Sequence, residues 1–367
     1  MPDTDATGRL TVDLDALARN YRTLVAAAAP AECGAVVKAD AYGLGMRQVA
    51  LRLRREGCRR FFVANVAEGR ALRELLPDAA ILVFEGAVTA SSAAVCVTAR
   101  LTPVLNSLGQ VECWLGQAGG GERRPAAVHI DTGMTRLGMT AAEVDALAGR
   151  EDWLAQLRIE LVMTHLACAD EPEHPLNDAQ LQRFAALRAR LPGAPTSIGN
   201  SAGMLTGANR CGNVARPGIA LYGGNPFVDR HNPMAPVVTL EGRIVQLRSI
   251  EAASTVGYGA TYATAAPARL AVLGVGYADG YPRCLGNIGV AAVADRRVPV
   301  VGRVSMDLTC VDVSGVEASR VHVGDWVELI GPRVPLEEVA TAAGTINYEI
   351  LTGLGCRLER RYVEQGQ

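Results

Sequence analysis

Short apolar runs alternate with helix-like segments over the N-terminal two thirds of the chain. In the helix-like segments apolar residues recur at helical spacing, as at 45–57 and at 177–193, where Asn177 and Gly193 suit the two ends. The apolar runs between these segments are typical of buried strands. The predicted strands are 34–38, 61–65, 81–84, 102–106, 126–131, 159–165, 195–200 and 214–223.

Strands that alternate with helices predict a parallel sheet, and eight such repeats have the size of a closed (β/α)8 barrel of the TIM type. The alternative is an open, doubly wound sheet. That fold usually carries a G-x-G-x-x-G turn after its first strand, whereas the turn in this chain is DAYGLG at 40–45. We therefore expect the barrel.

The pattern changes after Pro233. Short β-rich runs broken by Gly and Asp replace the long helical patterns, apart from a modest helical pattern at 336–344. We therefore predict two domains, an α/β barrel at residues 1–233 and a mostly β domain at residues 234–367. The strand predicted at 8–15 precedes the barrel strands and can pair with either domain.

Composition argues against several classes of function. The formal net charge is −2 and there is no basic run, which argues against nucleic-acid binding. The first residues include acids and no apolar signal segment, and no stretch is long and apolar enough to span a membrane, so we expect a cytoplasmic protein. The nine cysteines include no C-x-x-C pair, and the H-x-x-C spacing of His165 and Cys168 lacks further ligands, so we expect reduced thiols and no metal site.

Lys38 ends the first predicted strand and is the only lysine of the chain, so that the remaining 35 of its 36 Lys and Arg residues are Arg. A lysine amine, unlike a guanidinium, loses its proton when it is desolvated and can then form a Schiff base. A solvated surface charge is the ordinary explanation of a lysine, but in this chain such a charge is expected to be Arg. We therefore predict a chemical role for Lys38.

Other polar residues also fall at the C-terminal ends of the predicted strands, where barrels of this kind hold their active sites. Each alone has an ordinary explanation, such as a core histidine or a helix cap, but their joint placement favours a site. Small residues after the last two strands leave room for a phosphate at backbone N–H groups. An amine opposite a phosphate seat fits pyridoxal 5′-phosphate (PLP), which is an electron sink for carbanion chemistry. These residues are Arg136, His165, Asn200, Ser201, Arg216 and Gly218.

A series of motifs makes the chain resemble the alanine racemases, which are PLP enzymes with a barrel and a C-terminal β domain. The resemblance runs from Leu10 to Arg361, which is nearly the whole chain. The motifs, in order, are VVKADAYGLG, HIDTGMTRLG, MTHLACAD, NSAG, ARPGIALYG, VGYGATY, GYADGYPR, GRVSMD and TINYE.

The resemblance implies cofactor-binding roles at the matching positions. Lys38 is similar to the Schiff-base lysine, Arg216 to the partner of the pyridine nitrogen, and His165 to the residue that lies against the ring. Arg136 is expected beside the cofactor's phenolic oxygen and the substrate carboxylate. The other expected cofactor-binding residues, most of them at the phosphate, are Tyr42, Asn200, Ser201, Tyr348 and the N–H groups of Gly218 and Ile219.

The resemblance also implies racemisation by two bases, because a proton taken from one face of Cα has to be returned to the other. Lys38 and Tyr258 are the expected bases, and each needs a pKa below its usual value of about 10. Met306 and Asp307 match residues of the substrate pocket. In the family Tyr258, Met306 and Asp307 reach the site from the partner subunit, which implies a head-to-tail homodimer.

One departure from the family pattern falls at His129. Many members carry a carbamylated lysine there, bonded to the Arg at the position of Arg136, and this chain has no second lysine. His129 itself or a bound anion is the expected replacement.

Several alternatives stay open. A related barrel class decarboxylates basic amino acids, but it is expected to place a carboxylate, not Arg216, at the ring nitrogen. A non-enzymatic PLP-holding protein is expected to lack the β domain, and a cofactor-free Schiff-base aldolase has no use for Arg216. Among substrates, Asp307 and the small pocket that the resemblance implies favour alanine, and serine or a wider substrate range is the alternative. The sequence also leaves open whether the enzyme supplies D-alanine for peptidoglycan or degrades alanine.

Overall fold

The structure is a computed structural model that describes residues 5–117 and 123–364. The chain divides into two compact units, and each is described by itself. The barrel unit consists of Ala18–Leu221 and Asn225–Met234. The β unit consists of the N-terminal residues as far as Leu17, the short segment Tyr222–Gly224, and the chain from Ala235 onward.

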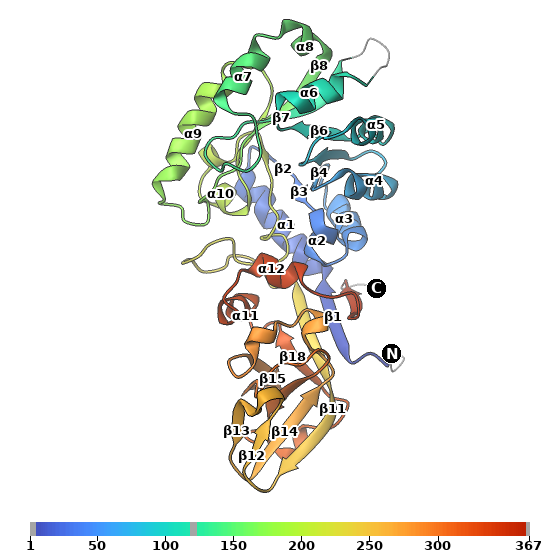
Figure 1. The fold of residues 1–367 in the computed structure, drawn as a ribbon, viewed down its shortest axis with the longest axis vertical. Coiled ribbons are helices and arrows are strands. Elements are labelled where there is room, and N and C mark those ends of the chain that lie inside the picture. The colour runs from blue at the N-terminus through green and yellow to red at the C-terminus, as the bar shows by residue number, and fades with distance from the viewer. Residues whose placement is uncertain (1–4, 118–122, 365–367) are drawn as a thin grey trace. The chain divides into compact units, whose positions relative to one another are not determined.

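The barrel unit is built on a parallel sheet whose strands follow one another in chain order (Figure 1). Each of these strands lies within or beside one of the predicted apolar runs, and their side chains are mostly buried. A strand buried on both faces reads as a continuous apolar run, which is why the runs were informative. The strands are β3 (Ala35–Val36), β4 (Arg60–Val63), β5 (Ala80–Val83), β6 (Thr102–Leu105), β7 (Arg124–His129), β8 (Leu157–Met163) and β9 (Thr196–Ser197).

The segment around β10 (Val214–Ala215) closes the barrel. β10 pairs in parallel with β2 (Glu32–Cys33), and the N–H of Val36 donates to the carbonyl of Pro217 at 2.9 Å. On its other side the N–H of Arg216 donates to the carbonyl of Gly199 at 2.8 Å. The predicted barrel is therefore confirmed and the open sheet is wrong. The regular part of the last strand is much shorter than the predicted run 214–223, because the chain turns after Pro217.

Helices lie around the outside of these strands (Figure 1). Local sequence explains where several of them start: Asn65, for example, accepts the N–H of Glu68 with its side chain at 3.0 Å and so caps α4. The helices are α1 (Leu14–Ala28), which begins in the β unit, and α3 (Met46–Arg55), α4 (Val66–Leu75), α5 (Ala90–Thr98), α6 (Leu108–Leu115), α7 (Ala141–Ala148), α8 (Glu151–Gln156), α9 (Pro175–Arg188) and α10 (Ser201–Leu205). The short segment α2 (Lys38–Tyr42) is a left-handed turn and no regular α-helix.

The ends predicted for the helix at 177–193 are wrong. Helix α9 starts at Pro175 with His174 as its N-cap and ends at Arg188. Asn177 lies inside the helix, fully buried, and its side-chain amide donates to the carbonyls of Cys168 and Glu171 at 2.9 and 3.0 Å. Its side-chain amide therefore fixes the loop before the helix, a role that capping patterns do not reveal.

The β unit is mostly β, as predicted. In its main sheet the strand order is β16-β15-β18-β11-β1-β19, and β14 pairs with both β11 and β17. Strands β12 and β13 pair antiparallel as a separate two-stranded sheet. The strands are β1 (Gly8–Asp13), β11 (Val238–Ile250), β12 (Ser254–Val256), β13 (Tyr262–Thr264), β14 (Ala268–Leu273), β15 (Val290–Val293), β16 (Arg296–Pro299), β17 (Thr309–Asp312), β18 (Trp326–Ile330) and β19 (Glu359–Val363).

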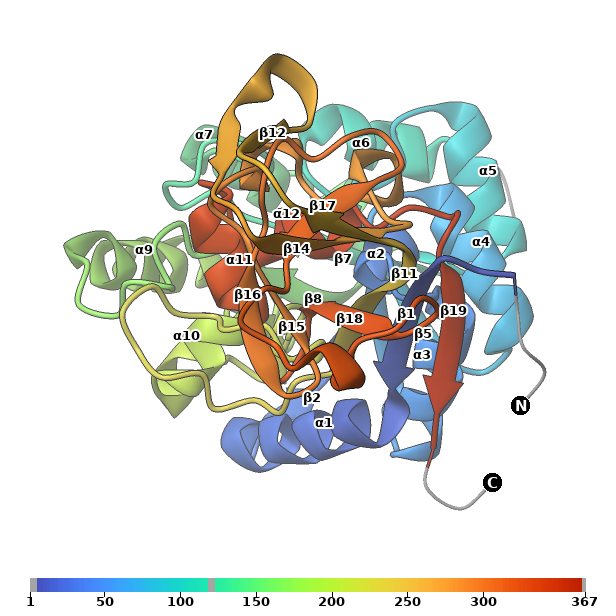
Figure 2. The same cartoon turned by 90° about the horizontal axis from the view of Figure 1, so that it is seen from below.

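Strand β1 is an inner strand of this sheet, flanked by β11 and β19 (Figure 2). It pairs antiparallel with β11 and in parallel with β19. Leu10 and Val12 point into the core and are fully buried, as the alternation of GRLTVD requires. The unit also holds the short helices α11 (Leu336–Ala342) and α12 (Asn347–Thr352), of which α11 is the helix predicted at 336–344. Within the described ranges, no helix of either unit has the length and apolar character needed to cross a membrane.

Candidate active site

Lys38 stands at the start of a left-handed turn that directly follows β3. Ala39, Asp40, Ala41 and Tyr42 all have φ between 52° and 57°. This conformation costs roughly 1–2 kcal/mol for each residue that has a Cβ. Neighbouring structure therefore has to hold the turn in place.

Glu68, on α4, is one residue that holds this turn. One of its carboxylate oxygens accepts the N–H of Ala39, and the other accepts the N–H of Ala64, both at 2.8 Å. These N–H groups follow β3 and β4, so a single carboxylate ties together the ends of two adjacent strands. Bonds from N–H groups to a charged acceptor are stronger than neutral ones.

The Lys38 amine lies in a mostly buried environment that favours its neutral form. Burial lowers its pKa below the usual value and the nearby Arg136 guanidinium lowers it further, while Glu68 and Glu85 act in the opposite direction. The Nζ atom also lies 5.9 Å from the centroid of the Phe84 ring. An amine that loses its proton readily can serve as a nucleophile or a base.

Arg216 is almost completely buried, with 2% of its surface exposed. Its guanidinium donates to the Ser197 hydroxyl, to the Thr164 carbonyl at 2.7 Å and to the Ile198 carbonyl at 3.3 Å. Burial lowers its pKa to about 9, so it remains charged at neutral pH. The protein thus holds a cation at the barrel's C-terminal end by hydrogen bonds to neutral acceptors.

His165 contacts this cation. Its Nδ1 lies 3.3 Å from Nη2 of Arg216. A guanidinium only donates, so Nδ1 is the acceptor and the ring proton resides on Nε2. Burial, followed by the charges of Arg216 and Arg136, lowers the pKa of His165 well below its usual value, so the imidazole is neutral.

Gln180, fully buried on α9, fixes the loop that His165 begins. Its side-chain amide donates to the His165 carbonyl and to the Thr132 hydroxyl, both at 3.0 Å, and its oxygen accepts the N–H of Ala167 at 2.9 Å. The Thr132 hydroxyl lies 2.8 Å from that of Thr164. Gln180 therefore joins the loop after β7, which carries Arg136, to the loop after β8.

A cradle for an anion lies beside these loops. The Ser201 hydroxyl accepts the N–H groups of Gly218 at 2.9 Å and of Ala220 at 3.3 Å. A Cβ on Gly218 would lie 2.2 Å from the Tyr42 hydroxyl, so only glycine allows this approach. Two hydroxyls and several backbone N–H groups thus gather at one place, which is a donor set suited to phosphate.

The other two predicted residues of this region are also placed. Ile219 lies between the two N–H groups that reach Ser201 and is fully buried. Asn200 is the N-cap of α10, where its side chain accepts the N–H of Gly203 at 2.9 Å. Its side chain therefore acts as a helix cap.

His129, at the end of β7, is bonded to Asn106. Its Nδ1 lies 2.8 Å from Oδ1 of Asn106, whose amide nitrogen donates to the carbonyls of Phe84 and Val104 at 2.9 Å. These two carbonyls fix the amide orientation, so Nδ1 of His129 must be the donor. Burial and then the charge of Arg216 lower the pKa of His129 to about 4, so it is neutral and its Nε2 is an acceptor.

Arg136 lies on the exposed loop after β7. Asp131 shapes the start of this loop, since its Oδ1 accepts the N–H groups of Gly133 and Met134, both at 2.9 Å. The charge of Arg136 contributes to the lowered pKa values of Lys38, His129 and His165. The structure therefore gathers the predicted barrel residues at the C-terminal ends of the strands.

The β unit carries the remaining predicted residues. Tyr258, in a short turn after β12, is 72% exposed, and Met306 is 53% exposed. Asp307 accepts a hydrogen bond from Arg357 at 2.7 Å, which orients its carboxylate. Tyr348 lies on α12 and is partly exposed.

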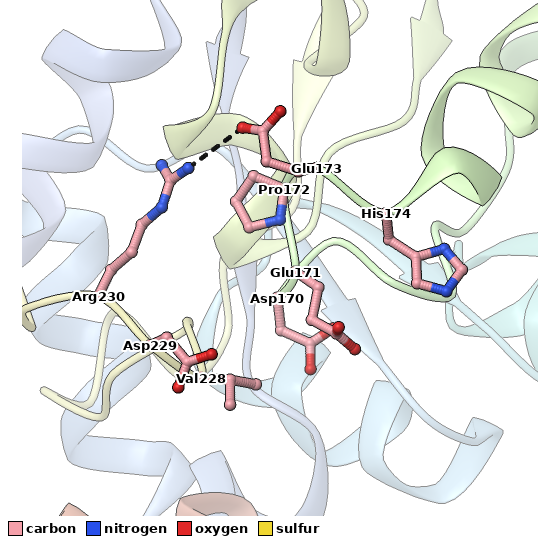
Figure 3. A pocket seen from close by; sticks show the side chains of 8 residues that line it. All are labelled: Asp170, Glu171, Pro172, Glu173, His174, Val228, Asp229 and Arg230. Carbon is pink, nitrogen blue, oxygen red and sulfur yellow. Dashed lines mark ion pairs between the residues drawn. The ribbon is translucent and has the colours of Figure 1, made fainter.

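A surface pocket of about 420 Å³ lies elsewhere on the barrel unit, between the segments 170–174 and 228–230 (Figure 3). Glu173 and Arg230 approach each other across it at 3.5 Å. None of the predicted site residues lines this pocket, so we do not take it as the candidate active site. In the described ranges no group of three or more His, Cys, Asp or Glu residues is arranged to hold a metal ion.

Sequence reasoning missed several residues that shape the site. Glu68 follows Asn65 by three positions, which reads as an ordinary helix-capping pair. Gln180 lies in a helix that gave no chemical signal. The other residues missed are Asn106, Ser197 and Ala220.

Comparisons with known proteins match the chain over nearly its whole length. Family models described as the alanine racemase N-terminal and C-terminal domains match residues 12–226 and 237–362. An alanine racemase of Rhodospirillum rubrum is 49% identical over 360 residues, covering 97% of this chain and 96% of the relative. A catabolic alanine racemase of Agrobacterium fabrum is 45% identical and covers 98% and 93%. The crystal structure of alanine racemase from Bartonella henselae with covalently bound pyridoxal phosphate has a TM-score of 0.91 at 38% identity, covering 98% of this chain and 100% of that one.

Proposed function

The chain belongs to the alanine racemase family, and we propose that it interconverts L-alanine and D-alanine with PLP as its cofactor. One observation carries the proposal: a single amine of lowered pKa and a cradle of hydroxyl and N–H donors stand at the same end of one barrel. A relative of similar fold binds PLP covalently, which agrees with an attachment through Lys38.

The residues present fit this cofactor. Lys38 would hold its aldehyde carbon, and Ser201, Tyr42 and the N–H groups near Gly218 would hold its phosphate. When bound, PLP supplies an electron-withdrawing ring that makes the Cα proton of an attached amino acid acidic.

Arg216 would face the pyridine nitrogen. Its guanidinium donates hydrogen bonds and cannot accept a proton, so it would keep that nitrogen unprotonated. The ring is then a weaker electron sink, which limits side reactions such as transamination. The decarboxylase alternative expects a carboxylate at this position, so a buried Arg216 disfavours it.

Lys38 and Tyr258 are the proposed bases for the two faces of Cα. Lys38 belongs to the barrel unit and Tyr258 to the β unit. We propose that Tyr258, Met306 and Asp307 serve the site of a partner subunit in a head-to-tail homodimer. The high exposure of Tyr258 and Met306 in the single chain supports this proposal.

Subunit mixing tests the shared site. Lys38→Arg and Tyr258→Phe variants are each expected to be inactive, and a mixed dimer is expected to regain activity because one of its two sites is then intact. Mixed dimers that stay inactive would argue for sites complete within one chain.

The proposed reaction is tested with purified holoenzyme and L-alanine in D₂O, followed by chiral chromatography and mass spectrometry. Deuterated D-alanine that approaches an equal mixture is the expected result, and Lys38→Arg should abolish it. Deuterium in L-alanine without any D-alanine would contradict the role of Tyr258. No exchange in a protein that holds PLP would favour a decarboxylase or a cofactor carrier.

The proposal also covers the physiological role of the enzyme and its range of substrates. We propose a cytoplasmic enzyme that acts on alanine, either to supply D-alanine for peptidoglycan or to degrade alanine. Rescue of a D-alanine-requiring bacterium would support the first role, and rates with serine measure the substrate range.

A further inference from the structure

We propose that Glu68 is a positioning residue for Lys38: its carboxylate holds the left-handed turn after the lysine and ties it to the end of the neighbouring strand. The inference rests on the proposed role of Lys38 as the residue that binds PLP. No motif that suggested the function includes Glu68.

Strain in the turn explains why it needs such a contact. Ala39 has a φ of 52°, which an alanine does not adopt without outside support. The nitrogen of Ala39 is joined directly to the carbonyl carbon of Lys38, so a fixed N–H at Ala39 also fixes the backbone of the lysine. If Ala39 relaxed to a negative φ, the chain after Ala39 would take another course, and Lys38 would lose the turn that follows it as a support.

The contact joins separate elements. Glu68 comes from α4 and reaches Ala39 after β3 and Ala64 after β4, both at 2.8 Å. Asp40, in contrast, accepts the N–H of Met46 at 2.7 Å, which is a contact within the same segment. Glu68 therefore provides a link between the strained turn and two strands of the barrel.

Glu85 offers a matched control. Its charge acts on the Lys38 amine in the same direction as that of Glu68. Its side chain is exposed, and its contacts to neighbouring loops use its backbone: its N–H donates to Ala64 and its carbonyl accepts from Gln110. Glu85→Gln thus removes a charge near the amine and leaves the turn untouched.

The experiment compares the holoenzymes of wild type, Glu68→Gln, Glu68→Asp and Glu85→Gln. The Glu68→Asp side chain keeps the negative charge but is too short to reach both N–H groups. It therefore distinguishes the effect of the hydrogen bonds from the effect of the charge. It is also a second variant to measure if Glu68→Gln does not fold. Three quantities are measured: hydrogen exchange of the peptide that contains Ala39, the rate of PLP release into a trap, and kcat and KM for alanine.

Both Glu68 variants are expected to exchange faster at Ala39 and to release PLP faster by about tenfold, the change that follows the loss of one charge-assisted hydrogen bond. Their kcat should fall more than their KM changes. Glu85→Gln should remain within about twofold of wild type in exchange and release.

Two outcomes overturn the inference alone. In the first, the wild type binds PLP covalently, but the Glu68 variants show the same hydrogen exchange and PLP release as Glu85→Gln. The other is exchange that rises equally throughout the barrel, which would mean a general loss of stability. A wild type that forms no covalent link to PLP would overturn the proposed function as well, so the two failures are distinguishable.

Discussion

Replacement of Gln180 by Met tests whether the buried amide on α9 stabilises the loops that carry Arg136 and His165. Met has nearly the volume of Gln, so the change removes hydrogen bonds and leaves little cavity. The His165 carbonyl and the Ala167 N–H each lose the partner that Gln180 provides. The Thr132 hydroxyl keeps its contact with Thr164 at 2.8 Å.

The expected loss of stability follows from these two backbone groups. A buried group left without a partner costs about 1–3 kcal/mol. Because His165 and Ala167 are partly buried, we expect a loss of about 2–4 kcal/mol in the free energy of unfolding of the barrel unit. For a domain of roughly 150–250 residues this lowers Tm by at least about 4 °C.

The assay is thermal unfolding of the holoenzyme at saturating PLP, followed by circular dichroism. Gln156→Met is the matched control, since Gln156 is exposed and donates to the Asp152 carbonyl at 2.9 Å. The control is expected to change stability by less than about 0.5 kcal/mol. If the two variants unfold at the same temperature, the hydrogen bonds of Gln180 do not stabilise the barrel unit, and the reasoning is wrong.

Three further predictions concern the site itself. Arg216→Glu should raise transamination relative to racemisation, because the ring nitrogen can then be protonated, and an unchanged ratio of pyruvate to D-alanine would refute this. Folding lowers the pKa of His129 from its usual 6.5 to about 4, so at low pH the unfolded chain binds a proton that the folded protein does not. The stability that the neutral imidazole provides is therefore complete above pH 6.5 and is lost as the pH falls towards 4. Between pH 7 and pH 5 the wild type should therefore lose about 2 kcal/mol more than His129→Gln in urea unfolding, whereas equal losses would show that the imidazole is not held neutral. Ser201→Ala removes the acceptor of the Gly218 and Ala220 N–H groups and a donor to the phosphate, so the dissociation constant of PLP should rise by about tenfold in equilibrium dialysis, and an unchanged constant would place the phosphate elsewhere.

The hydrophobic pattern predicted the fold well because most residues of the barrel strands are buried and helices such as α3 bury one apolar face. The lone lysine led to the candidate site, because its place at a strand end can be read from the local sequence alone. The roles of Lys38 and the other site residues remain predictions.

The conformation of the site was less accessible to sequence reasoning. Local preferences of Ala39, Asp40 and Ala41 favour right-handed structure, and contacts from other elements override them. Glu68 and Gln180 resemble ordinary helix residues, since Ala39 and Thr132, which they bind, lie far away in the sequence. Asn177 misled because its side chain binds carbonyls of the preceding loop and does not cap the helix.

The inner position of β1 has a consequence for biosynthesis. Arg9, near the start of the chain, pairs with Glu359, near its end. A ribosome that adds about 5–20 residues per second needs roughly 20–70 s to make the residues between them. The barrel strands are complete well before β19 has been made, so the nascent chain still carries an unpaired edge on β1 after the last barrel strand is synthesised. We expect the main sheet of the β unit to be completed only once β19 has been made, so β1 remains open to pairing with other strands until then.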